Sequence, residues 1–310
     1  MYLPCLAITN KISNHTISNH MQKIMLNKIS LLISAMLIVS SSAVYPQDQY
    51  NLVTPHFKSG TVIKINIDAH ATDGVLIQRS GDEEKRASMS VSKNYSLERT
   101  TLKNNNNIET EIHYNIIRVI TNTQILFKGE KIPKATLIDL SDIEVVGIKD
   151  SSDNWQFSII NDEHNKDVED LVSELEAYEN RKWFSKHPVK IGDSWKIYPA
   201  FTNFIMSRDL QKVDTEGTMT LLDVGDKGEN KIATLKFSAT SNGVDESPEK
   251  GLRKASSDTQ GLLQYSINQQ LDTNLVITSQ LESSVRQGDT YISVLLPFTY
   301  KVKKSIMQAH

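Results

Sequence analysis

Cysteine is almost absent from this sequence: the single residue among 310 is Cys5. It lies well ahead of the apolar stretch described below, whereas a lipid-bearing cysteine directly follows such a stretch, so a lipoprotein is not expected. If the chain is cleaved after Ala43, no thiol remains. Disulfides, a cysteine nucleophile, a thiolate metal site and an iron–sulfur cluster are then excluded. The mature chain must derive its stability from packing alone.

Runs of like charge and long apolar runs are also missing. The 34 Lys and Arg residues nearly balance 37 Asp and Glu residues, for a net charge of -3. Without a basic run, we do not expect binding to nucleic acid through its phosphates. A hydrophobic fraction of 39%, with 13 Gly and 8 Pro, excludes collagen, low-complexity disorder and a polytopic membrane protein.

Motifs for catalysis, cofactors and metals are not found. The sequence contains no His-Glu-x-x-His, no Gly-x-Ser-x-Gly and no phosphate-binding loop. Acids on an exposed helix face lack the desolvation that tunes a general acid or base, and we expect this of Glu169, Asp170, Glu174, Glu176 and Glu179. We therefore predict a protein that is not an enzyme and holds neither cofactor nor metal. A hydrolase whose site is assembled from distant residues is the alternative.

The first 43 residues resemble a leader and secretory signal peptide. A short basic stretch after Met21 is followed by an apolar stretch over 29–39 and by small residues that end at Ala43, which is the three-part pattern of such peptides. About eleven apolar residues are too few for the roughly 20 that span a bilayer. We predict export to the periplasm or the extracellular space, with no membrane span after cleavage. Met21 or Met25 is an alternative start, and a retained anchor is the alternative to cleavage.

After an extended lead-in at 44–54, the chain alternates between apolar and polar residues. In 61–69, Ile63, Ile65 and Ile67 fall on one face, and the same period of two recurs in 108–116 and 233–239. Such segments are half-buried strands joined by polar turns. The clearest hairpin flanks 272–274, and 80–86 and 242–258 are expected to be mobile loops. The fold class predicted is mainly β (α+β), with curved antiparallel sheets.

One segment, 165–184, is predicted to be a long amphipathic helix. Its apolar residues recur at steps of three and four, acids occupy its first turn and Arg181 and Lys182 its last, as the helix dipole favours. Pro188 follows and prevents the helix from continuing. The helix and connector, 163–187, separate two β-rich parts, 55–162 and 188–304, and residues 305–310 form a tail.

A short motif recurs on the two sides of this helix. Lys58, Gly60 and Lys64 are matched by Lys190, Gly192 and Lys196 at a constant offset, and each glycine precedes a strand. This repetition favours two similar halves produced by internal duplication, although a chance match is the alternative.

The segment Pro-Val-Lys-Ile-Gly-Asp-Ser-Trp, which ends at Trp195, resembles the signature of an uncharacterised family of exported bacterial β-rich proteins. That family has no agreed activity and no catalytic residues to transfer. Its members are similar to the lipoprotein-carrier type of fold, which implies a curved antiparallel sheet closed by a helix.

Large aromatic residues gather around the predicted helix. Trp155, Trp183, Trp195 and Tyr198 could line an apolar ligand cleft between helix and sheet, or form the core where the two meet. The function predicted is an exported, non-enzymatic protein that binds a lipid or other apolar ligand, or an envelope protein. The alternative is a structural or adhesive envelope protein that acts through strand edges and loops. In that alternative the final strand, 291–304, is a protected edge because it contains Pro297 and several lysines.

Overall fold

The computed structural model describes residues 48–105, 108–128, 134–161, 166–197, 212–247 and 251–308. The predicted signal peptide, its cleavage site and Tyr198 lie outside the described residues. From Gln49 onward the chain forms one unit. Within the described ranges, no helix is both long and apolar enough to cross a membrane.

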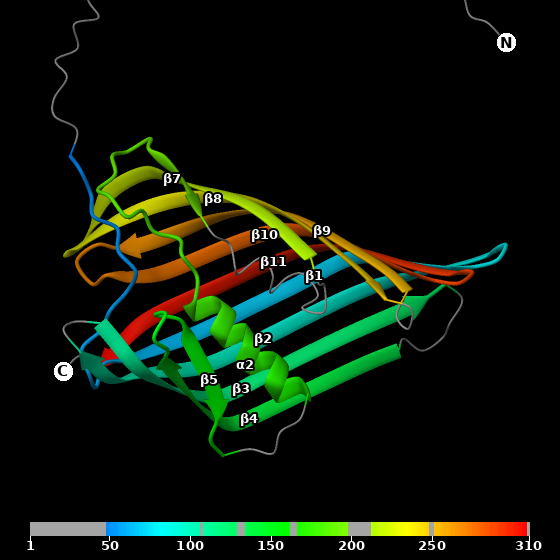
Figure 1. Cartoon of the computed structure of the whole chain (residues 1–310), viewed down its shortest axis with the longest axis horizontal. Helices are drawn as coiled ribbons and strands as arrows, with labels where there is room; N and C mark the ends of the chain where they lie inside the picture. The colour runs from blue at the N-terminus through cyan, green and yellow to red at the C-terminus, as the bar shows by residue number, and fades with distance from the viewer. Residues whose placement is uncertain are drawn as a thin grey trace, which may run out of the picture. The chain divides into compact units, whose positions relative to one another are not determined.

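The prediction of a mainly β protein is confirmed, and the described strands join in a single open antiparallel sheet (Figure 1). The order across the sheet is β5-β4-β3-β2-β1-β11-β10-β9-β8-β7-β6. The elements are β1 (Val62–Ser80), β2 (Glu83–Asn105), β3 (Ile108–Phe127), β4 (Lys134–Lys149), β5 (Trp155–Ile159), α2 (Lys166–Glu179), β6 (Ser194–Ile197), β7 (Lys212–Lys227), β8 (Asn230–Ser247), β9 (Gly251–Ser266), β10 (Leu271–Gln287) and β11 (Thr290–Gln308).

The order of the strands follows a simple path. The chain starts at the centre of the sheet with β1 and meanders outward to the edge strand β5. It then passes through α2 to the opposite edge, β6, and meanders back until β11 pairs with β1. Both parts predicted from the sequence therefore progress across the sheet in the same direction and share one continuous sheet.

The repeated motif forms the same turn twice. Gly60 and Gly192 both have positive φ, 85° and 94°, which glycine adopts without a steric cost. In each turn the residue after the glycine bonds back to the lysine carbonyl, and the glycine N–H bonds to the next strand. The pairs are Thr61 N to Lys58 O (3.1 Å), Gly60 N to Thr101 O (2.8 Å), Asp193 N to Lys190 O (3.0 Å) and Gly192 N to Leu221 O (2.7 Å). This likeness supports the relation between the halves, and duplication stays a prediction.

The helix α2 packs on one face of the sheet, which we call the inner face; the opposite side is the outer face (Figure 1). Its buried residues are Val168, Leu171, Val172, Leu175 and Tyr178, so the predicted apolar stripe is confirmed. The helix ends at Glu179 rather than at residue 184. Two side chains stop it: Asn180 bonds both the N–H (2.7 Å) and the carbonyl (2.9 Å) of Trp155, and the Arg181 guanidinium donates to the Tyr178 carbonyl at 2.7 Å.

Two predicted loops are strands. Residues 80–86 contain only the two-residue turn at Gly81 and Asp82 between β1 and β2, and 242–258 belong largely to β8 and β9. In 242–258 the exposed polar residues alternate with buried ones such as Asp245 and Ser257, and the exposed ones meet water as one face of an antiparallel sheet can. The expected hairpin between β9 and β10 is confirmed, but its turn lies at 267–270 and not at 272–274. Asp272 is a buried strand residue, for a reason given below.

The final strand is not an edge. β11 lies at the centre of the sheet, between β1 and β10. Its register with β1 is interrupted between the pairs His70–Thr299 and Val75–Leu295, so Pro297 lies opposite a β-bulge. A bulge is one of the few places where a sheet tolerates a residue without an N–H.

Candidate functional site

The aromatic residues singled out from the sequence occupy two separate places. The Trp183 side chain is 1% exposed and stacks on Phe237, with ring centroids 5.7 Å apart. The Trp195 indole donates to the carbonyl of Trp183 at 2.8 Å. Trp155 lies instead on β5, where its ring contacts Phe157. None of these three tryptophans lines any of the cavities discussed below, and their role in ligand binding stays a prediction.

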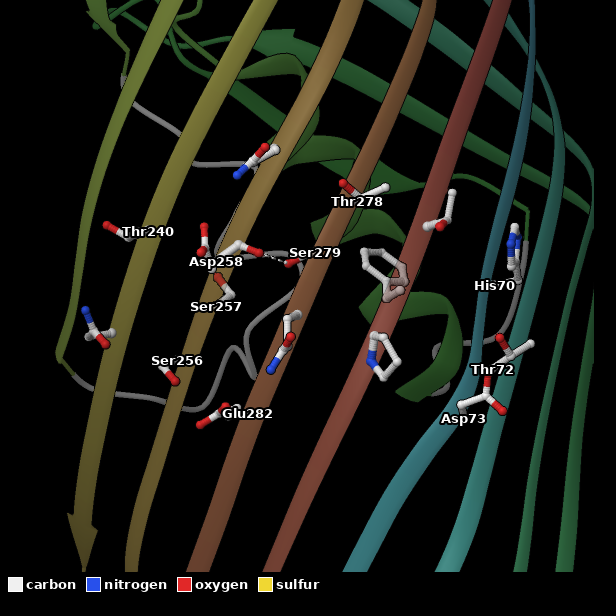
Figure 2. Close-up of a pocket in the computed structure, with 16 residues that line it drawn as sticks. His70, Thr72, Asp73, Thr240, Ser256, Ser257, Asp258, Thr278, Ser279 and Glu282 are labelled. Atoms are coloured by element: carbon white, nitrogen blue, oxygen red, sulfur yellow. Dashed lines mark hydrogen bonds between the residues drawn. The ribbon is translucent and has the colours of Figure 1, made fainter.

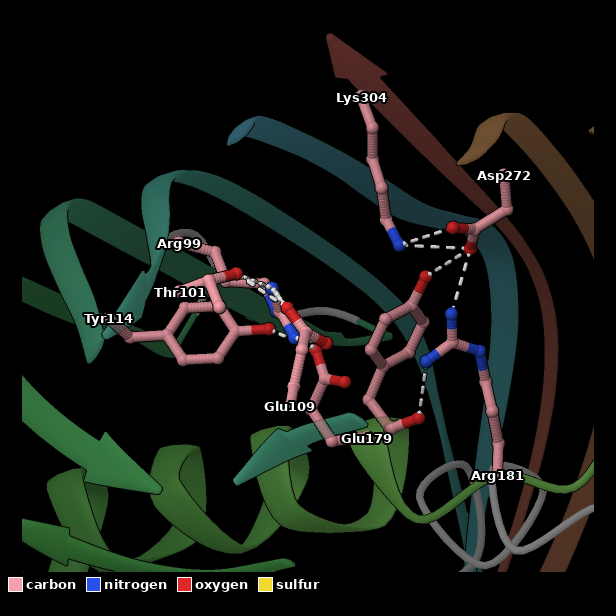
Figure 3. Close-up of polar contacts among 9 residues, drawn as sticks. Arg99, Thr101, Glu109, Tyr114, Glu179, Arg181, Asp272 and Lys304 are labelled. Atoms are coloured by element: carbon pink, nitrogen blue, oxygen red, sulfur yellow. Dashed lines mark hydrogen bonds and ion pairs between the residues drawn. The ribbon is translucent and has the colours of Figure 1, made fainter. Parts of the chain in front are cut away.

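A buried ionic cluster lies at the C-terminal end of α2 (Figure 3). The Arg99 guanidinium of β2 forms a two-pronged pair with Glu109 of β3, at 3.0 and 2.8 Å, and its Nε reaches Glu179 of α2 at 3.2 Å. The hydroxyls of Thr101 and Tyr114 donate to Glu109 and Glu179, each at 2.5 Å. The cluster therefore fixes the end of the helix to two strands of the N-terminal half.

A second cluster joins the same helix end to the C-terminal half. Asp272 of β10 accepts bonds from Lys304 of β11 at 2.8 and 2.9 Å, from Arg181 at 2.9 Å and from the Tyr178 hydroxyl at 2.9 Å (Figure 3). The Arg181 guanidinium also lies over the Tyr178 ring, 3.8 Å from its centroid. These partners explain why an aspartate can stand inside a strand at 3% exposure.

The charges of the two clusters set their pKa values. Burial alone would raise the pKa of Glu179, but Arg99, Arg181 and Lys304 hold it below its usual range. Burial also opposes ionisation of Asp272, yet Lys304 and Arg181 lower its pKa to about 2. Desolvation lowers the pKa of Lys304 to about 8, against the attraction of Asp272. At neutral pH the carboxylates of Glu179 and Asp272 therefore face the cations of Arg99, Arg181 and Lys304.

This network is structural rather than catalytic in its geometry. The cavity between the clusters measures about 20 Å³, which is room for one water molecule and for no substrate. Among the described residues, no group of three or more His, Cys, Asp or Glu side chains could hold a metal ion. The two ionic clusters fix the C-terminal end of α2 to strands of both halves.

Sequence reasoning missed these residues because the acids of the helix were expected on an exposed face. That expectation is wrong for Glu179, which is buried with Arg99, and for Glu174, which lies 3.4 Å from Lys93 and accepts a 2.9 Å bond from Tyr95. A usable signal was present: Glu179 follows Leu175 by four residues and Glu174 follows Leu171 by three. Both acids therefore lie on the apolar stripe of the helix.

Beyond the helix, the inner face carries an apolar cavity of about 130 Å³, which we call the inner cavity. Its lining residues are Ala69, His70, Ala71, Val91, Lys93, Leu281, Leu296, Phe298 and Tyr300. Gly74 permits this arrangement because a Cβ there would lie 2.6 Å from Leu296 Cδ1. Tyr300 also lines a narrower space of about 20 Å³ beneath α2, so the cavity adjoins the helix.

Comparison with known proteins adds little to this geometry. No family model matches the sequence, and no curated protein matches it. A solved structure of DynF, from the dynemicin biosynthesis pathway of Micromonospora chersina, is similar at 11% sequence identity and a TM-score of 0.18, over 84% of this chain and 86% of that chain. Similarity at that TM-score carries no argument about fold or function. The site must be interpreted from its own residues.

Proposed function

We propose that the protein is an exported, non-enzymatic binding protein whose inner cavity receives the end of a single acyl chain. The observation that carries this proposal is the inner cavity itself. Seven of its nine lining residues are apolar or aromatic, and they lie on the face that α2 covers elsewhere. An apolar cavity with a few polar groups is the usual form of a small-molecule site.

The size of the cavity limits its occupant. Ordinary small-molecule pockets measure roughly 300–1,000 Å³, so about 130 Å³ accommodates part of one chain and not a multi-ring compound. The inner face continues past the cavity toward the strand tips through the half-buried side chains of Leu76, Met89 and Val294. A chain end could therefore be buried while the remainder lies along the sheet.

Lys93 gives the occupant a preferred charge. Lys93 lines the cavity, and its ammonium group lies 3.4 Å from Glu174, which is longer than the roughly 2.7–2.9 Å of a strong charge-assisted bond. A ligand carboxylate or phosphate would compete with Glu174 for this cation. We therefore expect an anionic amphiphile to bind more tightly than a neutral one of equal chain length. The resemblance to exported proteins similar to lipoprotein carriers agrees with such a ligand.

Oleate titration of the delipidated protein tests the proposal. Val91 is half-buried and lines the cavity, so V91F should fill it and weaken oleate binding at least tenfold. Val75 stands on the outer face at 37% exposure, which makes V75F the matched control with unchanged affinity. Equal binding of oleate to V91F and wild type, or no binding to wild type, would overturn the proposal.

Export is tested separately. Fractionation of cells that express the full chain should find the protein outside the cytoplasm with its leader removed.

One observation supports the alternative function, a structural or adhesive protein that acts through its strand edges. β5 pairs with β4 only over Val145–Lys149, and Leu137 on the remainder of β4 is 67% exposed. In the described part of the chain no strand pairs with β4 on that side before Val145. An unpaired edge can receive a strand from a partner. Crosslinking from position 137 in intact cells would capture that partner, and an absence of products would count against this role.

A further inference from the structure

The outer face is hollowed where β8, β9, β10, β11 and β1 cross its middle (Figure 2). The hollow, which we call the outer groove, measures about 810 Å³. It is within the range of ordinary ligand pockets and several times larger than the inner cavity. It lies on the opposite side of the sheet from α2 and takes no part in the function proposed above.

His70 and Phe298 line both spaces, but the other residues of the outer groove differ in kind from those of the inner cavity. Three carboxylates, Asp73, Asp258 and Glu282, line it together with side-chain amides and hydroxyls, and no Lys or Arg is among its lining residues. All three carboxylates are exposed. The groove therefore offers many hydrogen-bond acceptors and a negative charge, which disfavours anions and apolar chains.

These groups stand in rows because the strands are in register. Thr240, Asp258 and Gln280 are direct neighbours across β8, β9 and β10. Asn242, Ser256 and Glu282 form the next row on the same face. Neighbouring strands are about 4.8 Å apart, so each row presents polar groups at a regular interval. A rigid sheet thus holds the acceptors without the entropy cost of ordering a loop.

The bulge in β1 completes one wall of the groove. Asp73 has a φ of 62°, a left-handed conformation that aspartate tolerates better than most residues. It stands with Thr72 across the groove from β8 and β9, and Figure 2 shows both near His70 on β1. Bulges often redirect side chains beside functional sites. Here the bulge brings a third carboxylate to the groove.

We propose that the outer groove binds a saccharide chain that carries amino groups. Vicinal hydroxyls and ammonium groups are donors that the carboxylates, amides and hydroxyls of the rows can accept. A basic peptide would match the charge of the groove but matches its surface less well. Peptides add to a sheet at its edges, or anchor side chains in pockets. The outer groove lies on the face of the sheet, and the lining residues labelled in Figure 2 are all polar.

Calorimetric titration with a tetramer of glucosamine tests the proposal, with the fully N-acetylated tetramer as the uncharged comparison. We expect the glucosamine tetramer to bind at least tenfold more tightly than its acetylated form. The double variant D258N/E282Q should lose at least tenfold in affinity. E246Q is the matched control, because Glu246 is an exposed carboxylate of β8 outside the groove, and its affinity should be unchanged.

Three results would overturn the proposal: no binding of the glucosamine tetramer, equal loss of affinity in E246Q, or tighter binding of a lysine-rich peptide that depends on Asp258 and Glu282. The two proposals can fail separately, because V91F should leave glucosamine binding unchanged and D258N/E282Q should leave oleate binding unchanged. The bulge is tested by D73N, which keeps the left-handed tolerance and removes the charge. It should weaken binding by a few fold.

Discussion

The two ends of the inner face solve the problem of burial in opposite ways. Under the C-terminal end of α2, six charged side chains are buried and neutralise one another, with about 20 Å³ left between them. Beyond the N-terminal end of α2, apolar side chains are left half-covered around a cavity of about 130 Å³. The comparison teaches that polarity here fixes an element in place, while the apolar end stays half-covered and is the place where we propose that a ligand binds.

The two ends of the inner face should also differ in how much a single substitution changes the free energy of unfolding. A buried ion pair often contributes little beyond an apolar replacement, because desolvation offsets the attraction, whereas removal of one partner strands a charge. An open apolar cavity gives up contacts that a filled one would make. The ionic end should therefore respond strongly to single substitutions and the cavity end weakly.

The largest effect is expected from Arg99→Ala. The change leaves Glu109, 2% exposed, and Glu179 without their cation, and breaking a buried pair in this way costs about 3–5 kcal/mol. Urea unfolding measures the free energy of unfolding. Arg99→Lys keeps a positive charge but not the two-pronged geometry, so it should lose less stability than Arg99→Ala and remain folded. The matched control is Arg118→Ala on the exposed pair with Asp139, which should unfold like wild type.

The next effect tests the packing of the helix itself. Leu171 and Leu175 are 4% and 5% exposed, and each change to Ala should cost about 2–5 kcal/mol through lost burial and a residual cavity. Leu137→Ala, at an exposed site, should change the free energy of unfolding by about 0.5 kcal/mol or less. If both helix variants lost only a few tenths of a kcal/mol in the free energy of unfolding, the helix would contribute no packing to the inner face. The contrast between the ionic end and the cavity end of that face would then disappear.

Acidification should lower the free energy of unfolding by a smaller amount. The pKa of Asp272 is lowered from 3.8 to about 2 in the folded protein, so its contribution is present above pH 4 and is lost as pH falls toward 2. A difference of this size corresponds to about 2 kcal/mol. The pKa of Glu179 is also lowered, which adds to the loss. Unfolding at pH 2.5, 4 and 7 measures it, and 1 M salt should not remove the effect, since buried pairs are poorly screened.

The sequence predicted the class of fold because alternation of apolar and polar residues is a local property. The strand around Ile63 and the apolar stripe through Leu171 and Leu175 were recognised for that reason. The ionic clusters depend instead on distant residues: Asp272 meets Lys304 and Arg181 only after the sheet has formed. From the sequence, Asp-Thr-Asn at 272–274 is typical of a turn.

The order of the strands could not be predicted for a similar reason. Pro297 and the lysines after it indicate an edge, yet β11 is central because it pairs with β1, more than 200 residues away. No local pattern encodes that pairing. The bulge that accommodates Pro297 also shapes the outer groove, which no local pattern indicates. The apolar cleft predicted from the sequence was assigned to tryptophans, and none of Trp155, Trp183 and Trp195 lines the inner cavity.

The smallest effect on stability, and the sharpest test of the comparison, is expected from Lys93→Met. Lys93 is partly exposed at 32% and its pair with Glu174 is long, so loss of the charge should change the free energy of unfolding by less than about 1 kcal/mol. The same change removes the cation that lines the inner cavity and should weaken oleate binding several fold, with little effect on a neutral amphiphile of equal chain length. Parallel urea unfolding and oleate titration separate the two readouts. A large loss of stability would place Lys93 with the ionic end of the inner face, and equal losses for both amphiphiles would show that charge does not select the ligand.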